Sequence, residues 1–143
     1  MKSDDHGMSQ IERTLIEKGF SRQRRVLYLP ETDSTNDDAA RMAAKGAAAG
    51  SIVIAREQRR GRGRIGKKWL SLPGNGLTFS YIARPEVKIG EVPRLTLAAG
   101  LAVANAIEAQ TGLVTTIKWP NDILINGRKV AGLLCEFQGE NLP

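Results

Sequence analysis

Short groups of apolar residues in the first half of the chain predict two strands with a helix between them. Residues 25–29 predict a short strand in which one arginine precedes a run of apolar and aromatic side chains. Residues 51–56 contain three consecutive β-branched side chains, a composition typical of a buried strand. Between these runs, Ser34 is followed three residues later by Asp37, which resembles the capping box at the start of a helix. Gly46 is placed to end that helix, because glycine readily adopts the left-handed conformation after a last turn.

The second half of the chain has a more regular pattern. Residues 77–83 and 114–118 predict strands, and residues 91–111 predict an amphipathic helix that ends at Gly112. The apolar face expected for this helix consists of Leu95, Ala98, Ala102, Val103, Ala106 and Ile107.

A hairpin is predicted near the end of the chain. Asn126 and Gly127 separate two strand-like runs, residues 123–125 and 128–134. An Asn-Gly pair in this position favours a type I′ turn, in which both residues have positive φ. The two runs should therefore pair as antiparallel strands.

Together these elements favour an α/β fold of the α+β type, a mixed and largely antiparallel sheet backed by helices, over a doubly wound parallel fold. A chain of 143 residues supports one domain with a single core. Hydrophobic residues at 41% and charged residues at 25% exclude wholesale disorder. We expect the domain to span residues 25–143, after a tail and a short helix (residues 9–18, ended by Gly19) within residues 1–24.

The cellular setting follows from features that the chain lacks. A single cysteine cannot form an intrachain disulfide, and no apolar run of about 18 residues exists that could cross a membrane. The polar first residues do not resemble a secretory signal, so a soluble, cytoplasmic domain is expected. Cys135, in a strand-like run, is interpreted as a buried structural thiol, and the isolated His6 is not expected to bind a metal.

Positive charge is concentrated in one segment of the chain. Lysine and arginine outnumber the acidic residues by 21 to 15, and seven of the basic residues lie at positions 56–68 among Gly61, Gly63 and Gly66. Glycines let backbone amides approach a ligand, and arginines donate paired hydrogen bonds to phosphate or carboxylate. We rank phosphate binding by this loop above RNA binding, and both above an inert loop. Trp69, which follows the loop, is expected either to stack on a purine or to anchor the loop in the core.

A second polar cluster is Lys118-Trp119-Pro120-Asn121-Asp122. Lys118 would offset negative charge on a substrate, and Asn121 or Asp122 would offer oxygen ligands to Mg²⁺. Considered alone, this cluster is better explained as ordinary turn chemistry.

A third polar cluster, Asp33-Ser34-Thr35-Asn36, follows the first predicted strand. Its ordinary role is to begin the next helix. The hydroxyl groups and the Asn36 amide would in addition face the polar head group of a small molecule.

The three clusters, in this order along the chain, resemble the catalytic domain of the biotin protein ligases. The matching stretches are residues 33–36, 58–69, 118–122 and 129–136. Each stretch alone is weakly specific, whereas the ordered set is highly specific and covers residues 26–137. The related lipoate ligases are not expected to combine this arginine–glycine loop with the cluster at 118–122.

This resemblance implies an ATP-dependent ligase. The carboxylate of biotin would attack the α-phosphate of ATP, giving biotinyl-5′-AMP and pyrophosphate, and a lysine of a biotin carboxyl carrier domain would then accept the biotinyl group. ATP and Mg²⁺ are the implied cofactors. Positioning and charge stabilisation would supply most of the acceleration.

The resemblance also implies roles for individual residues. The catalytic residues would be Lys118, Arg62 and Arg64. Biotin would be bound by Ser34, Thr35, Asn36, Gln58, Arg62, Gly63, Arg64 and Lys118. The nucleotide would be bound by Gly61, Arg62, Trp69, Asn121 and Asp122, with Asp122 also the metal ligand.

The ends of the chain differ from the family pattern. We expect neither the winged helix-turn-helix with which some members bind operator DNA nor the small C-terminal β-domain, and no membrane binding. A homodimer is one assembly that the sequence leaves open. Two alternatives to the ligase are a non-catalytic biotin- or adenylate-binding remnant and a basic RNA-binding module, the latter disfavoured by an aromatic content of 5%.

Overall fold

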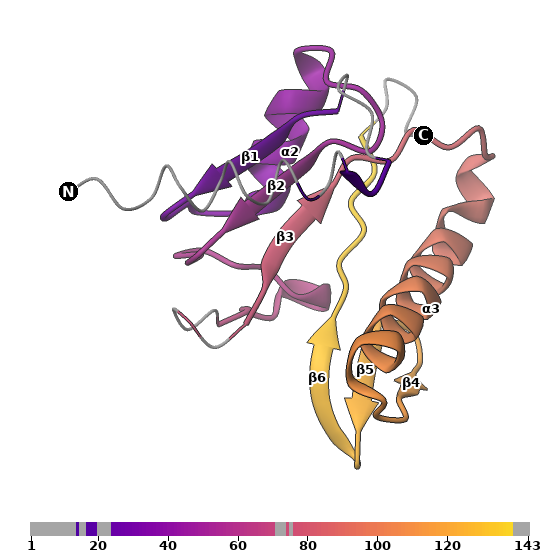
Figure 1. Cartoon of the computed structure of the whole chain (residues 1–143). Coiled ribbons are helices and arrows are strands. Elements are labelled where there is room, and N and C mark those ends of the chain that lie inside the picture. Colours follow the sequence, from indigo (N-terminus) through magenta and orange to yellow (C-terminus); the bar gives the residue numbers. More distant parts are fainter. Residues whose placement is uncertain (1–13, 15–16, 20–23, 71–73, 75, 139–143) are drawn as a thin grey trace. The chain divides into compact units, whose positions relative to one another are not determined.

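The structure, a computed structural model, describes residues 14, 17–19, 24–70, 74 and 76–138. The helix predicted at residues 9–18 lies almost wholly outside the described residues. The chain divides into two units, of which the first comprises Met1–Gly61 and Lys68–Arg84 and the second comprises Arg62–Lys67 and Pro85–Pro143. Each unit contains a sheet and a helix (Figure 1).

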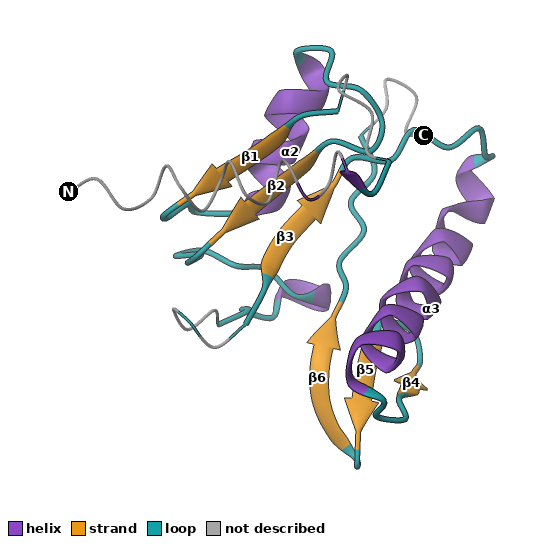
Figure 2. Cartoon of the chain, in the orientation of Figure 1, coloured by secondary structure: helices purple, strands orange, loops and turns teal. Residues whose placement is uncertain are grey.

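The first unit contains the sheet β1–β2–β3, formed by Val26–Leu29, Ile52–Ala55 and Thr78–Tyr81. β1 and β2 are parallel, whereas β3 is antiparallel to β2. Helix α2, Thr35–Ala44, connects the two parallel strands and packs against β2 and β3 (Figures 1 and 2). The strands predicted at 25–29, 51–56 and 77–83 are confirmed.

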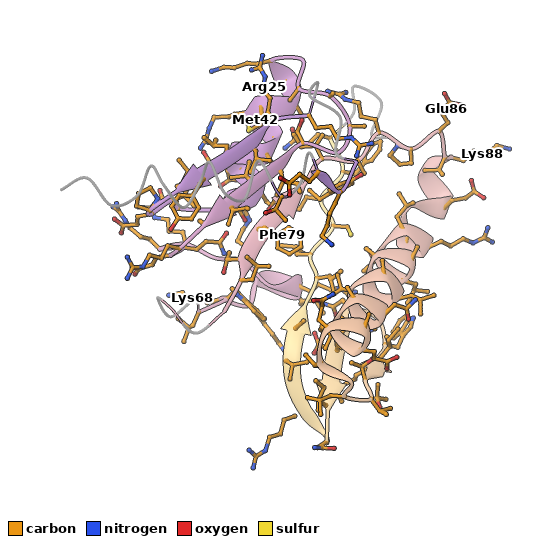
Figure 3. The ribbon with its side chains drawn as sticks, viewed as in Figure 1. Arg25, Met42, Lys68, Phe79, Glu86 and Lys88 are labelled. Carbon is orange, nitrogen blue, oxygen red and sulfur yellow. The ribbon has the colours of Figure 1, made fainter. Side chains whose placement is uncertain are left out.

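The core of the first unit lies between its sheet and α2. Val53 is fully buried and packs with Ala39 of α2 and Ile82, while Met42 of α2 is partly buried against them (Figure 3). Successive side chains of a strand point to opposite faces, so Phe79 of β3 lies on the face opposite α2, where it is exposed. The core is thus built from small and β-branched side chains on one face of the sheet.

The capping box predicted for α2 is wrong, although the helix begins where expected. Ser34 occupies the N-cap position, but its side chain makes no capping hydrogen bond. Instead, the backbone N–H of Thr35 donates to Oε1 of Gln58, 2.7 Å away and 23 positions along the chain. A distant side chain therefore takes the place of the local cap. At the other end, Gly46 has φ of 83°, as predicted for a residue that follows a helix.

The second unit contains helix α3, Val92–Thr111, and the antiparallel sheet β4–β5–β6 (Figure 2). Its strands are Thr116–Lys118, Asp122–Ile125 and Arg128–Gly132. α3 packs against β4 and β5, and Ile123 of β5 is fully buried. With one parallel pairing and three antiparallel pairings in the described chain, the predicted mixed and largely antiparallel α/β fold is confirmed.

Only part of the apolar face predicted for α3 is buried. Val103 and Ile107 are half-buried as expected, whereas the three alanines of that face (Ala98, Ala102 and Ala106) are exposed. The most deeply buried positions of the helix are Gly100 and Ala104. These small residues are four positions apart and therefore share one face of the helix.

The predicted hairpin is confirmed. Asn126 and Gly127 have φ of 50° and 75°, and they join β5 to β6. β6 ends at Gly132, however, and Cys135 is exposed, so its interpretation as a buried strand residue is wrong. The reason is that β5, the partner of β6, begins at Asp122, which pairs with Gly132, so the register of the two strands ends before Cys135.

The C-terminal part of α3 contains a carboxylate, Glu108, whose charge should matter for stability. Oε1 of Glu108 accepts hydrogen bonds of 2.8 Å from both N and Oγ1 of Thr115. These two bonds, first the backbone one, favour the charged form and so lower the pKa of Glu108.

We expect Glu108→Gln to destabilise the protein near neutral pH but not in acid. A carboxyl group with a lowered folded-state pKa contributes stability above its ordinary pKa of about 4.3, and this stability is lost as the pH falls through the folded-state pKa. Urea unfolding at about pH 6 and about pH 3 should therefore show a difference between variant and wild type that shrinks at the lower pH. A difference of the same size at both pH values would contradict this.

No described helix has both the length and the apolar character needed to cross a membrane.

Candidate functional site

Two of the predicted clusters follow the carboxyl ends of the parallel strands β1 and β2. Beyond the strands, the backbone N–H of Thr32 donates to the carbonyl of Glu57 over 3.0 Å, and that of Arg59 donates to the carbonyl of Thr32 over 2.9 Å. A further bond of 2.9 Å joins the N–H of Arg60 to the carbonyl of Asp33. The two segments therefore run side by side and bring the cluster at 33–36 next to Gln58. Ligand sites in sheets with parallel strands commonly lie at this edge.

A buried network of hydrogen bonds links three elements of the first unit. Oε1 of Gln58 accepts from N and Oγ1 of Thr35, at 2.7 and 2.9 Å. The hydroxyl of Ser80 lies 2.8 Å from Oγ1 of Thr35, to which it donates, and it also contacts Oδ1 of Asn36. Thr35 and Ser80 are only 3% and 8% exposed. Because a backbone N–H can only donate, the amide oxygen of Gln58 must face Thr35, and its Nε2 is left as the donor end.

Ser80 is a member of this network that the sequence analysis missed. It lies in β3, whose neighbouring residues are aromatic or apolar, and it pairs with Val53 in the sheet. Alternation places both residues on the face toward α2. The sequence signal for this role was a polar residue at a strand position where the alternating pattern requires a buried, apolar side chain.

Gly61 is buried where two backbone segments approach each other. Its carbonyl accepts a hydrogen bond of 2.8 Å from N of Trp69. A Cβ at this position would lie 2.6 Å from the carbonyl oxygen of Trp69 and 3.0 Å from Nε2 of Gln58. Only glycine fits this approach. Trp69 itself is half-buried, which leaves both of its predicted roles open.

We expect Gly61→Ala to loosen the contact between Gly61 and Trp69. The new methyl group would collide with a carbonyl oxygen, and losing one hydrogen bond should speed amide exchange at Trp69 by about tenfold. Gly76→Ala is the matched control, since a Cβ there meets nothing within 4 Å. Hydrogen exchange of both variants checks this, and equal protection of Trp69 in both would show that the backbone absorbs the methyl group.

Two arginines of the basic segment pair with carboxylates of the first unit. Arg59 forms an ion pair with Glu31, and the hydrogen bond from that carboxylate raises the pKa of Arg59. Arg60 lies 3.9 Å from Asp33. All four side chains are substantially exposed. These pairs therefore partly neutralise the charge of the segment at the ends of β1 and β2.

The rest of the predicted loop, Arg62–Lys67, belongs to the second unit and closes on itself. The N–H of Gly63 donates to the carbonyl of Lys67 over 2.7 Å, around a short 3₁₀ turn, η1, at Arg64–Gly66. Within this turn Ile65 has φ of 56° and is 91% exposed. A β-branched residue rarely adopts positive φ, and such strained conformations are common in ligand-binding loops.

The two arginines predicted to be catalytic have different surroundings. Nε and Nη2 of Arg62 donate to the two carboxylate oxygens of Glu136, over 3.2 and 3.0 Å. Arg64 is exposed and forms no ion pair with any residue that the structure describes. Arg62 is thus held by a carboxylate, whereas Arg64 is not. No role for Glu136 is predicted from the sequence.

Lys118 and Asp122 lie opposite each other on β4 and β5. Nζ of Lys129, on β6, lies 2.7 Å from Oδ1 of Asp122. Alternation puts Asp122 on the opposite face of the sheet from the buried Ile123. The sheet therefore carries two lysines around one carboxylate, with Lys118 exposed at the end of its strand.

Asn121 has a structural role in addition to the predicted one. Its Nδ2 donates to the carbonyl of Leu133 over 2.9 Å, and its own carbonyl accepts from N of Leu133 over 2.9 Å. The turn interpretation of this cluster therefore holds for Asn121. A cis peptide bond between Trp119 and Pro120 lies within the same turn.

The described residues contain no group of three or more histidine, cysteine or carboxylate side chains that could hold a metal ion. Asp122, the predicted ligand, is paired with Lys129. Magnesium is commonly bound by one or two carboxylates together with substrate phosphates. Asp122 would fit only such a shared site, and its metal role stays a prediction.

Comparisons with known proteins give a consistent result. Residues 28–142 match the family model described as the biotin/lipoate A/B protein ligase family. The chain is 45% identical over 115 residues to the bifunctional ligase/repressor BirA of Bacillus spizizenii, covering 80% of this chain and 35% of that protein. It is 40% identical over 113 residues to the biotin–[acetyl-CoA-carboxylase] ligase of Paracoccus denitrificans, covering 78% and 46%.

Solved structures are similar as well. The biotin protein ligase from Aquifex aeolicus in complex with biotin and ATP aligns with a TM-score of 0.68 and 37% identity, over 79% of this chain and 47% of that one. The biotin protein ligase from Leishmania major in complex with biotinyl-5-AMP aligns with a TM-score of 0.70 and 32% identity, over 81% and 53%. The chain therefore spans between about a third and about half of the proteins that it resembles.

Proposed function

This chain belongs to the biotin/lipoate A/B protein ligase family, and on that basis we propose that it forms the catalytic part of a biotin protein ligase. It would activate biotin with ATP and transfer the biotinyl group to a lysine of a biotin carboxyl carrier domain. The relatives' names and the biotin, ATP and biotinyl-5-AMP complexes support this choice within the family.

The observation that carries the proposal is the buried network of Thr35, Gln58 and Ser80. In that network the acceptor end of Gln58 is occupied, so its Nε2 remains to donate. The ureido carbonyl of biotin is an acceptor that needs such donors. Since the network is buried and fixed by several hydrogen bonds, it would bind this group without further ordering.

The proposed reaction has two steps. A carboxylate oxygen of biotin forms a bond with the α-phosphorus of ATP, while the bond from that phosphorus to the bridging oxygen breaks and pyrophosphate leaves. The ε-amine of the carrier lysine then attacks the acyl carbon, AMP leaves, and the amine loses a proton as the amide forms. Both steps bring negative groups together or create them, so cationic side chains should lower the barriers.

Each predicted residue has a role in this scheme. Lys118 would offset the charge shared by the biotin carboxylate and the α-phosphate, and Arg62 and Arg64 would bind the same two groups. Trp69, Gly61 and Asn121 would contact the nucleotide. Asp122 would hold Mg²⁺ together with phosphate oxygens, and the ion would supply charge neutralisation. The remaining biotin contacts are assigned to Ser34, Thr35, Asn36, Gln58 and Gly63.

The test is incubation of the chain with biotin and ATP labelled at the α-phosphate, followed by addition of a biotin carboxyl carrier domain. We expect labelled biotinyl-AMP and then a biotinylated lysine detected by mass spectrometry. Biotin binding by calorimetry without adenylate would instead support the non-catalytic remnant. Binding of RNA but not of biotin would support the basic RNA-binding module. The carrier partner, a cytoplasmic location, the absence of DNA binding and the oligomeric state stay predictions.

A further inference from the structure

We propose that Lys129 is a positioning residue that binds the carboxylate of Asp122 and so keeps the ammonium group of Lys118 available to an anionic ligand. This inference rests on the proposed function, because it concerns how Lys118 acts there. It assigns a role to a lysine of β6 that the predicted site does not include.

The register of the second sheet places the three side chains on one face. β5 lies between β4 and β6 (Figure 1). Lys118 of β4 is directly opposite Asp122 of β5. Lys129 of β6 is opposite Leu124, which is two positions along β5 from Asp122. Because paired residues share a face, as do residues two apart on one strand, the two lysines flank Asp122 from neighbouring strands.

The turn and a β-bulge together produce this arrangement. The two-residue turn fixes the first pairs of the hairpin and so sets Lys129 opposite Leu124. The register then shifts by one residue on β6, so that Gly132 and not Ala131 is opposite Asp122. Gly132 carries no side chain. The position on β6 directly opposite the carboxylate is therefore without a side chain, and the lysine reaches the carboxylate from the diagonal position.

The contacts show which of the two lysines binds the carboxylate. Nζ of Lys129 lies 2.7 Å from Oδ1 of Asp122, and the side chains of this pair are only 40% and 23% exposed. Lys118 is exposed and forms no ion pair with any residue that the structure describes. Opposite charges that face each other on neighbouring strands attract. Without Lys129, the carboxylate would therefore be expected to pair with Lys118.

The balance of charge on this face decides how strongly it attracts an anion. Two ammonium groups and one carboxylate leave one net positive charge. If Lys129 is removed, the charges of Lys118 and Asp122 cancel, and the attraction for a phosphate or carboxylate group falls. Lys129 thus acts on the ligand through Asp122 and Lys118, without having to touch the ligand itself.

The experiment measures pyrophosphate binding by calorimetry in the absence of divalent metal ions, so that the predicted metal role of Asp122 does not enter. We expect Lys129→Met to bind pyrophosphate about fivefold more weakly than the wild type, and Asp122→Asn to bind it about fivefold more tightly. The double variant has the same net charge on this face as the wild type. Its affinity should therefore return to within about twofold of the wild-type value.

This rescue is the decisive result, because a merely structural role of Lys129 would not produce it. If the double variant binds as weakly as Lys129→Met, then Lys129 contacts the anion directly and the proposal is wrong. Equal binding by wild type and Lys129→Met would also overturn it. Lys129→Arg keeps the charge and should bind within about twofold of the wild type.

Arg128→Met is the matched control. It removes one cation from the neighbouring position of the same strand, where the side chain points to the other face of the sheet, and it should leave the affinity within about twofold. Thermal melting of each variant identifies any loss of folding. If Lys129→Met does not fold, Lys129→Gln takes its place in every comparison.

A second measurement separates this inference from the proposed function. In adenylate formation, Lys129→Met should lower kcat by about fivefold, because the charge of Lys118 is then partly cancelled by Asp122. If the wild type binds pyrophosphate but forms no adenylate, the proposed ligase activity is wrong. The loss in Lys129→Met and its rescue in the double variant would in that case still support the role of Lys129. If the ligase is active and kcat of Lys129→Met equals that of the wild type, the role of Lys129 is wrong and the proposed function stands.

Discussion

Replacing Lys118 by alanine is expected to slow the formation of biotinyl-AMP by about 100- to 1,000-fold, while the protein remains folded. A charge placed in advance at the reacting centre stabilises a transition state without reorganisation, so its loss should lower kcat more than it raises KM. Lys118 is exposed at the end of β4. The melting temperature should therefore change little.

The sheet around Lys118 suggests why this lysine would be available to a substrate. The carboxylate opposite it, Asp122, is already paired with Lys129. The two lysines therefore share one negative group, which leaves net positive charge on this face of the sheet. Lys88→Ala, an exposed lysine in the segment before α3, is the control and should be silent. An unchanged rate of adenylate formation in Lys118→Ala would assign Lys118 to a structural role only.

The second large effect is expected at the hairpin, where Gly127→Val should destabilise the protein by about 2 kcal/mol. Gly127 has φ of 75°, a conformation that β-branched residues avoid. A Cβ at this position meets nothing within 4 Å, so the loss would come from backbone strain alone. Thermal or urea unfolding measures it.

Two variants make the hairpin prediction specific. Gly127→Asn should lose much less stability, because asparagine tolerates positive φ better than other non-glycine residues. Gly76→Val tests a glycine that also has open space but lacks positive φ, and it should cost little. If Gly127→Val melts at the wild-type temperature, the strained conformation at this turn does not matter for stability.

Several elements could be predicted because their causes are local. The strand at 51–56 follows from three adjacent β-branched residues, and the turn at Asn126 and Gly127 follows from two residues that accept positive φ. Gly112 ends α3 with φ of 70° for the same kind of reason. In each case a few adjacent residues decide the conformation.

The errors concern contacts between distant parts of the chain. Ser34 and Asp37 fit the pattern of a capping box, but Gln58 supplies the hydrogen bond to the first turn of α2. The acceptor that the backbone N–H of Thr35 meets depends on the parallel pairing of β1 with β2. No local sequence pattern indicates that pairing. Cys135 was misplaced because the end of β6 depends on where its partner strand begins.

In the candidate site, too, the local features could be predicted from the sequence and the long-range contacts could not. Its clusters could be found from the sequence, because glycine, arginine, lysine and hydroxyl residues occur there in an ordered and specific set. Ser80 and Glu136 could not be assigned, because each contacts a partner at least 44 positions away. Their neighbours in the sequence carry no sign of that partner.

By itself, the sequence determined the type of most elements, the turn residues and the chemistry of the candidate site, since these depend on side chains and short-range backbone preferences. Only the tertiary structure decided the pairing of strands, the buried side of α3, and which polar groups meet. These features depend on contacts among residues that are far apart in the chain. Several hydrogen-bond acceptors of the same chemical type occur in the sequence, and only the fold decides which of them meets a given donor. The amide of Gln58 and the carboxylate of Glu136 are the clearest cases: their chemistry was visible in the sequence, and the fold decided that they bind Thr35 and Arg62.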